Sequence, residues 1–198
     1  MAATAANFLM NRTAKSIPAL AIAAWLAFGG AALAQPTCSD PLSKAFMPAR
    51  VTNPEPGDRQ AIMDLIHSYN WALDDKDAAA FAELFTEDAT YEACSVGVQI
   101  FKTTGKDPLG MYIQGVLQGL PFQTRHFESN TLLHAKDRAT VDGKWMLLVT
   151  IQRPDVETPA LDYTAVVKAT FIRDKDNLWR IAKLTLITDE PQIKARAR

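Results

Sequence analysis

The sequence predicts an α+β fold in which a long antiparallel sheet curves around helices that precede it in the chain. Two observations lead to this prediction. Between residues 58 and 85, apolar residues recur every three or four positions, as they do on one face of a helix. After Pro121 the pattern changes to strand-like runs separated by short turns, and such strands pair as an antiparallel meander. With 198 residues, the chain is long enough for one domain with a substantial core.

The first 34 residues have the pattern of a secretory signal peptide. Arg12 and Lys15 precede the apolar run 17-IPALAIAAWLAFGGAALA-34, which ends in the small-x-small sequence that signal peptidase reads. An uncleaved anchor is the alternative; we expect cleavage near Ala34 and a periplasmic or secreted protein. The run has no twin arginine, so we expect export as an unfolded chain. That route disfavours a cofactor loaded in the cytoplasm, and no cofactor is expected.

The charge pattern argues against a nucleic-acid partner. Without Arg12 and Lys15 the chain has 19 basic and 22 acidic residues. One basic block occurs, 194-KARAR-198 in the tail 191–198, and a short basic tail is usually a solvated chain end. Nucleic-acid binding requires a basic face, so no nucleic-acid partner is expected.

Cys38 and Cys94 are the two cysteines of the chain. An exported protein folds in an oxidising compartment, so we expect a Cys38–Cys94 disulfide that ties the N-terminal extension to the domain. Two unpaired small core residues are the alternative. The sequence has no CxxC motif and no cluster of histidine and cysteine, so no metal site is expected.

The domain proper is expected to span residues 58–190, after a proline-rich extension at 35–57 with five prolines. Its first helix begins at Asp58 and ends around Asp74–Lys76. One face of this helix is apolar and consists of Ile62, Leu65, Ile66, Tyr69 and Leu73.

Two shorter helices and five strands are expected after the first helix. Residues 77–85 predict the second helix. Asp107 and Pro108 predict the start of the third, with Asp107 as its N-cap and Pro108 at the first helical position, and Gly119 marks its end. The expected strands are 86–98, 123–134, 138–152, 162–173 and 178–188.

The strand that begins near residue 123 carries an unusual set of polar residues. Alternation along a strand places His126, Glu128 and Asn130 on one face. The other two histidines are expected near the surface, because His67 falls between the apolar positions of the first helix and His134 closes a strand. His126 therefore stands out, although a hydrogen-bonded structural role is the alternative to a functional one.

Three segments of the sequence resemble a known family. The segment 59-RQAIMDLIHSYNWALDDKDAAAFAELFTEDATYEA-93 resembles the opening of SnoaL-like and scytalone dehydratase-type domains of the nuclear-transport-factor-two-like superfamily. The shared pattern is a helix with a tyrosine and an aspartate near its end, followed by a helix that ends in Leu-Phe. The likeness continues through 124-TRHFESN-130 and 178-LWRIAKLTL-186, and it covers residues 59–188.

The resemblance implies a cone-shaped α+β barrel with a ligand inside the cone. In scytalone dehydratase and hexachlorocyclohexane dehydrochlorinase, an aspartate at a helix end orients a strand histidine that acts as a base. These two residues match Asp74 and His126. Tyr91 matches a pocket tyrosine of the dehydratase, and Tyr69 stands where the dehydrochlorinase has a lysine. Family members are often dimers through the outer face of the sheet.

This sequence also departs from the family pattern. The dehydratase has a second pocket histidine on a later strand, and neither 138–152 nor 162–173 contains one. The strand asparagine of the dehydratase falls on Lys168. The full set of residues that the dehydratase uses for elimination is therefore not present, and a different substrate is expected.

The resemblance implies a cofactor-independent lyase of the dehydratase type, with His126 and Asp74 as catalytic residues. Tyr69 and Tyr91 are expected to bind substrate or to be ordinary core tyrosines. Glu128 is expected either to share the pocket or to be turned out of it by a β-bulge. The substrate would be small, apolar, and aromatic or cyclic. The alternatives are an isomerase, cyclase or retro-aldol lyase, or a hydrophobic-ligand-binding protein without turnover. The small subunit of a ring-hydroxylating oxygenase shares the fold, but the signal peptide argues against it.

Overall fold

The structure is a computed structural model that describes Cys38 and residues 50–189. The predicted signal peptide, most of the predicted extension and the basic tail lie outside the described residues. Within the described part, no helix is both long and apolar enough to cross a membrane. Three helices and six strands make up this part: α1 (Pro56–Asp74), α2 (Ala78–Glu83), β1 (Phe85–Ser95), β2 (Val98–Thr104), α3 (Lys106–Gln118), β3 (Gln123–Ala135), β4 (Thr140–Gln152), β5 (Ala160–Arg173) and β6 (Trp179–Thr188).

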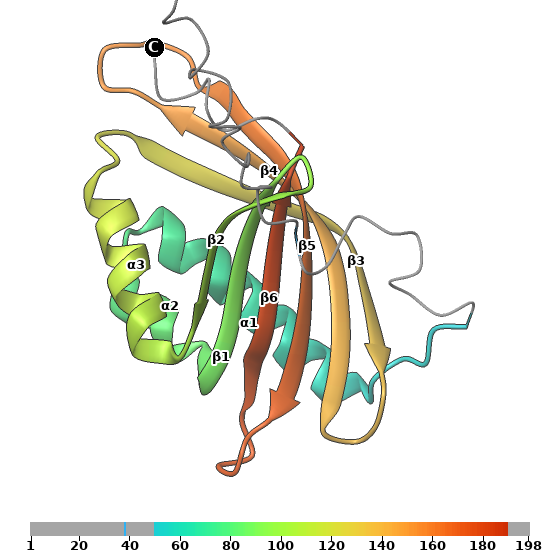
Figure 1. The fold of residues 1–198 in the computed structure, drawn as a ribbon. Helices are drawn as coiled ribbons and strands as arrows, with labels where there is room; N and C mark the ends of the chain where they lie inside the picture. The colour runs from blue at the N-terminus through green and yellow to red at the C-terminus, as the bar shows by residue number, and fades with distance from the viewer. Residues whose placement is uncertain (1–37, 39–49, 190–198) are drawn as a thin grey trace, which may run out of the picture. The chain divides into compact units, whose positions relative to one another are not determined.

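The strands form one curved sheet in the order β2-β1-β6-β5-β4-β3 (Figure 1). The predicted α+β fold is confirmed, and the four strands after residue 121 pair as the predicted antiparallel meander. Two details differ from the prediction. The pair β1–β6 is parallel, so the sheet is mixed. β2 and β3 form its two edges, so the sheet curves without closing into a barrel.

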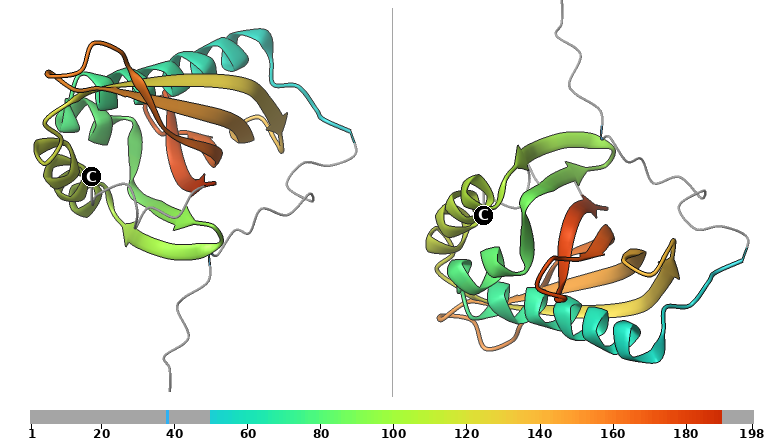
Figure 2. Two further views of the ribbon diagram at one scale, coloured as in Figure 1. Left: turned by 90° about the horizontal axis from the view of Figure 1, so that it is seen from above. Right: turned by 90° about the horizontal axis from the view of Figure 1, so that it is seen from below.

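The helices lie at the concave face of the sheet, as the two end-on views show (Figure 2). α1 runs along β3, and α2 packs on α3. Apolar residues of α1 such as Ile62 and Ile66 join alternate residues of the strands, such as Leu147 and Val167, in one core. This face of the sheet is called the inner face below. A helix laid along a curved sheet brings residues from the helix end and the inner strand face together.

Two local predictions were wrong. The expected strand 86–98 is the first arm of a hairpin, because Val96 and Gly97 have φ values of 49° and 83° and form a two-residue turn between β1 and β2. Asp107 is not the N-cap of α3. Gly105 takes that place with a φ of 98°, a conformation that glycine adopts easily, and Asp107 lies in the first turn.

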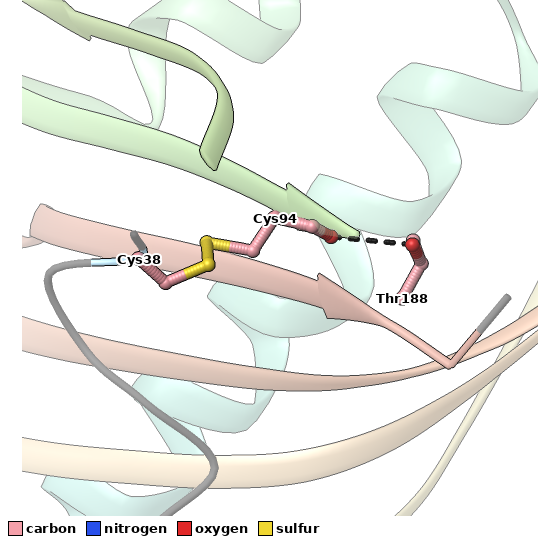
Figure 3. Close-up of a disulfide and its surroundings, with 3 residues drawn as sticks. All are labelled: Cys38, Cys94 and Thr188. Atoms are coloured by element: carbon pink, nitrogen blue, oxygen red, sulfur yellow. Dashed lines mark hydrogen bonds between the residues drawn. A yellow bond between two sulfur atoms is a disulfide. The ribbon is translucent and has the colours of Figure 1, made fainter. Parts of the chain in front are cut away.

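Cys38 and Cys94 form a disulfide with their Cα atoms 6.0 Å apart (Figure 3). Cys94 lies near the end of β1, and the backbone N–H of Cys38 donates to the carbonyl oxygen of Gly97 at 3.1 Å. Thr188 donates its hydroxyl hydrogen to the carbonyl oxygen of Cys94 at 3.2 Å. The disulfide and Ile187 form a small cluster separate from the main core. Cys38 is therefore held at the end of the β1–β6 pair.

Gly143 gives a test of how tightly the inner face is packed. A Cβ atom at Gly143 would lie 2.7 Å from Cε2 of Phe171 and 3.1 Å from Cδ2 of Leu133. Overpacking of this kind typically costs about 1–3 kcal/mol. We therefore expect Gly143→Ala to lower the free energy of unfolding by that amount in urea denaturation.

Gly115 in α3 is the matched control, because a Cβ atom there meets nothing within 4 Å. Alanine favours a helix over glycine, so Gly115→Ala should leave stability unchanged or raise it by up to about 1 kcal/mol. Equal stabilities for the two variants would contradict the packing described for Gly143.

Candidate active site

A buried carboxylate joins the end of α1 to β3. Asp74 is the last residue of α1, and its side chain is 6% exposed. Its Oδ1 accepts a hydrogen bond from the Thr124 hydroxyl at 3.0 Å, and its Oδ2 accepts one from the His126 backbone N–H at 3.0 Å. Nδ1 of the His126 imidazole lies 2.6 Å from Asp74 Oδ1. Asp74 and His126, predicted as a pair, are thus in direct contact.

The contact fixes the tautomer of His126. An ionised carboxylate only accepts hydrogen bonds, so Nδ1 must carry the shared hydrogen. In the neutral ring, Nε2 is then an acceptor with a free lone pair. The imidazole is 7% exposed, and alternation along β3 places it on the inner face. This arrangement can take a proton at Nε2, with Asp74 stabilising the imidazolium that results.

Asp74 is ionised despite its burial. Burial is the largest influence on its carboxyl group and acts to raise the pKa. The hydrogen bonds from the side chain and backbone of His126, the charge of His126 and the hydrogen bond from Thr124 outweigh it, so the pKa of Asp74 is lowered. The carboxylate is therefore available at neutral pH to orient the imidazole.

All four tyrosines of the chain belong to the main core or pack against it. The hydroxyls of Tyr69 and Tyr91 form a hydrogen bond, and Tyr69 is also within electrostatic range of Tyr112 and Tyr163. Burial is the main cause that raises the pKa values of Tyr69, Tyr91 and Tyr163. Phenols with raised pKa values remain protonated, so these hydroxyls can serve as hydrogen-bond donors.

Aromatic rings pack around the tyrosine hydroxyls. The ring centroids of Tyr69 and Phe81 are 5.1 Å apart, and the Tyr112 ring stacks on Phe101 at 3.5 Å. Tyr91 contacts both Phe85 and Phe101 edge-on or tilted, at about the distance preferred by aromatic pairs. The surroundings of the donors are therefore apolar, which strengthens any hydrogen bond formed there.

Glu128 shares the inner face with His126 but does not join the dyad. One of its carboxylate oxygens lies 3.3 Å from His67 Nε2, and the other accepts from the Thr131 hydroxyl at 2.6 Å. Its side chain is 17% exposed, at the seam between α1 and β3. Glu128, which was predicted to bind substrate, thus contacts His67 of α1 instead of His126.

Asn130 does not lie on the same face as His126, contrary to prediction. The pairing of β3 with β4 shifts between Ser129 and Leu132, and Asn130 has a φ of 55°. The side chain of Asn130 is exposed and contacts the sulfur of Met146. A β-bulge therefore reverses the alternation after Glu128, a change that a period-two pattern does not reveal.

Lys168 lies on the outer face of the sheet, so the alignment that put a pocket asparagine there was wrong. Its neighbours Val167 and Ala169 belong to the core, and successive strand residues point to opposite faces. Lys168 instead lines a hollow of about 180 Å³ on the outer face, with Lys136, Asp142 and Thr185.

Two interior residues, Asn70 and Tyr163, were not predicted as site residues from the sequence. Asn70 lies on the side of α1 that faces β3, between His67, which contacts Glu128, and Asp74. Its Oδ1 is buried and has no hydrogen-bond partner among the described residues. Each residue was detectable in the sequence: Asn70 as a polar residue beside an apolar helix face, and Tyr163 from its alternation with Ala165 and Val167.

Two further features bear on what the site can hold. Among residues 50–189 and Cys38, no group of three or more His, Cys, Asp or Glu side chains could bind a metal ion. A groove of about 1,090 Å³ runs between α2 and α3 and is lined by residues such as Ala82 and Met111. Neither this groove nor the outer hollow is lined by Asp74 or His126.

The lowered pKa of Asp74 predicts an acid dependence of stability. The folded pKa is below the unfolded value of about 3.9, so the carboxylate contributes stability at higher pH. This contribution is lost as the pH falls from about 4 through the folded pKa. We expect Asp74→Asn to be less stable than wild type at pH 6 and to lose less stability than wild type between pH 6 and pH 3, by urea unfolding.

Asp75 is the neighbouring control, because its side chain is exposed. Asp75→Asn should follow the wild-type curve. If Asp74→Asn and wild type lost equal stability over this range, the three hydrogen bonds to Asp74 would not contribute to folding.

Residues 55–185 match the SnoaL-like domain family. Comparison with curated proteins finds no match. Among solved structures, the β subunit of an aromatic-ring-hydroxylating dioxygenase assigned by inference in Novosphingobium aromaticivorans is 18% identical, with a TM-score of 0.61, and the alignment covers 71% of this chain and 94% of that one.

Two other solved structures share the fold. A candidate scytalone dehydratase from the same organism is 19% identical over 72% of this chain and 95% of its own, with a TM-score of 0.58. A protein of unknown function with a cystatin-like fold from Nostoc punctiforme is 18% identical over 70% and 96%, also with a TM-score of 0.58. At these identities the likeness concerns the fold alone. The family match spans well over half of the chain, and the protein therefore belongs to the SnoaL-like domain family.

Proposed function

We propose that this protein is a cofactor-independent lyase of the dehydratase type that uses His126 as a base on a small, apolar, cyclic or aromatic substrate. The observation that carries the proposal is the 2.6 Å contact between His126 Nδ1 and the buried Asp74 carboxylate. This contact leaves Nε2 as the acceptor on the inner face. A positioned base of this kind contributes about 10²–10⁴ in rate.

The proposed reaction begins with the removal of a proton from carbon. The C–H bond breaks, the proton binds to His126 Nε2, and Asp74 stabilises the imidazolium. The electron pair moves toward an oxygen of the substrate, which accepts a hydrogen bond from Tyr69 or Tyr91, as in an oxyanion hole. Loss of a leaving group from the neighbouring carbon gives a lyase, and return of the proton to another carbon gives an isomerase. Cyclase and retro-aldol chemistry would use the same base.

A protein that binds a hydrophobic ligand without turnover is the alternative. The aromatic packing around Tyr69 and Tyr91 would suit such a ligand equally well. A binding protein has no need for a buried carboxylate in contact with an imidazole, because burial of a charged group costs free energy. The dyad therefore favours catalysis.

We also infer that the protein is exported and is cleaved near Ala34. The signal-peptide pattern of residues 1–34 supports this inference. The Cys38–Cys94 disulfide fits an oxidising compartment. Export also disfavours a role as the small subunit of a cytoplasmic oxygenase, despite the similarity in fold.

Proton exchange tests the proposed function without knowledge of the natural substrate. 2-Tetralone, a neutral bicyclic ketone, exchanges its α-protons for deuterium in D₂O once a base removes them. We expect the protein to accelerate this exchange, as measured by ¹H NMR. His126→Gln should lower the rate of protein-catalysed exchange by a factor of about 10²–10⁴. Asp74→Asn should lose a smaller factor, and the ¹⁵N spectrum should then report a mixture of His126 tautomers.

His134→Gln serves as the control for histidine removal, because His134 lies at the end of β3 and accepts from the backbone of Thr52. This variant should catalyse deuterium exchange at the α-carbons of 2-tetralone at the wild-type rate. Equal exchange by wild type and His126→Gln, with 2-tetralone still bound, would reject the lyase proposal in favour of the binding protein.

We further propose that the protein is a homodimer or larger homo-oligomer through the outer face of β3 and β4. Phe127 is 56% exposed and pairs across the strands with Leu148, and Met146 is half exposed beside them. Contiguous exposed apolar side chains of this kind mark association surfaces.

We expect Leu148→Asp to lower the molar mass in sedimentation at micromolar concentration. Leu178→Asp, at an exposed site between β5 and β6, should keep the wild-type mass. A wild-type protein that sediments as a monomer would overturn this proposal.

A further inference from the structure

Tyr163 lies on the same inner face of the sheet as His126, two strands away from it. In the register of the sheet, His126 of β3 pairs with Val149 of β4, and Val149 pairs with Tyr163 of β5. The three residues therefore form one lateral row. Val149 is buried and Tyr163 packs against the main core, so the row lies on the inner face. His126 and Tyr163 are the polar ends of this row, with a valine between them.

The spacing of the row suits a small molecule. Neighbouring strands lie about 4.8 Å apart, so the Cα atoms of His126 and Tyr163 are about 10 Å apart. Both side chains extend from the same face of the sheet. A molecule held above Val149 could therefore contact the imidazole on one side and the phenol on the other. The pKa of Tyr163 is raised by burial first, then by Tyr91, Asp162 and Asp74, which agrees with a hydroxyl near the dyad.

The charges of the interior indicate which molecules would bind. The buried polar side chains among the described residues include one cation, Lys168, and it lies on the outer face. The Asp74 carboxylate contacts His126 directly, and the Tyr163 hydroxyl lies within electrostatic range of that carboxylate. An anionic substrate would meet a buried carboxylate without a compensating cation, which is unfavourable.

We propose that Tyr163 is a catalytic residue that donates a hydrogen bond to the carbonyl oxygen of a neutral substrate while His126 removes the adjacent proton. The proposal rests on the base role of His126 given above and names the substrate class as neutral carbonyl compounds. The C–H electron pair becomes the new C=C bond, and the carbonyl π pair moves to oxygen. The Tyr163 hydroxyl stabilises the charge that develops there. The proton remains on His126 Nε2 until it is returned or the leaving group departs.

Two probes separate the roles of Tyr163 and His126. Exchange of 2-tetralone in D₂O reports on the base. Binding of 2-naphthol, which has the shape of the enol of 2-tetralone, reports on the hydrogen bond to oxygen. We expect Tyr163→Phe to slow exchange about 10²-fold, in line with the loss of one oxyanion donor. It should weaken 2-naphthol binding about fivefold, the value of one neutral hydrogen bond.

Two controls accompany this variant. Tyr112→Phe removes a phenol hydroxyl from α3, outside the row, and should change either readout less than twofold. The ¹⁵N signals of His126 should be the same in Tyr163→Phe and wild type, which separates a catalytic role from a structural one. Naphthalene-2-carboxylate should bind at least tenfold more weakly than 2-naphthol.

The outcomes distinguish failure of the inference from failure of the proposed function. If Tyr163→Phe matches wild type in both readouts while His126→Gln abolishes exchange, the result supports His126 as the base and rejects the proposed role of Tyr163. If no variant affects exchange but Tyr163→Phe weakens 2-naphthol binding, the lyase proposal fails and Tyr163 is a ligand-binding residue. Absence of 2-naphthol binding to wild type, or equal binding of the carboxylate, would overturn the proposed substrate class.

Discussion

The three hydrogen bonds to the Asp74 carboxylate determine how the rest of the site is built. They come from two residues of β3, Thr124 and His126, and they hold the last residue of α1 against the sheet. A buried carboxylate without such partners would be costly, so the end of the helix and the edge strand must meet in one geometry. Gln123 adds a further bond to the carbonyl oxygen of Asp74 at 2.7 Å. The orientation of the His126 imidazole and the docking of α1 are therefore properties of the same contact.

The curvature of the sheet gives this contact its chemical setting. α1 lies along the concave face of the sheet (Figures 1 and 2). Tyr69 from the helix, Tyr91 from β1 and Tyr163 from β5 lie within electrostatic range of one another, although they are far apart in sequence. Burial keeps these phenols protonated, whereas hydrogen bonding keeps Asp74 ionised. The same interior therefore contains an imidazole hydrogen-bonded to a carboxylate and neutral phenol donors, the combination that the proposed proton removal beside a carbonyl requires.

The outer face of the same sheet has a different character. It has exposed apolar residues on β3 and β4 and a hollow whose lining includes Lys168 of β5 and Lys183 of β6. The disulfide holds Cys38 at the end of the β1–β6 pair. Alternation along each strand separates these features from the site, so changes on the outer face can be tested without altering the dyad.

The sequence by itself determined the fold class, the order of most elements and the residue types capable of acid–base chemistry. Periodicity is a local property, and a helix followed by alternating strands can be read without knowing what each contacts. Asp74 and His126 were identified in this way with the help of the family resemblance. Tertiary structure alone decided their contact, because it depends on the register of β3 against α1. It also decided that Glu128 binds His67, that a bulge turns Asn130 outward, and that Lys168 faces away from the site. A shift of one residue moves a strand side chain to the opposite face, and only the pairing of distant strands fixes that shift.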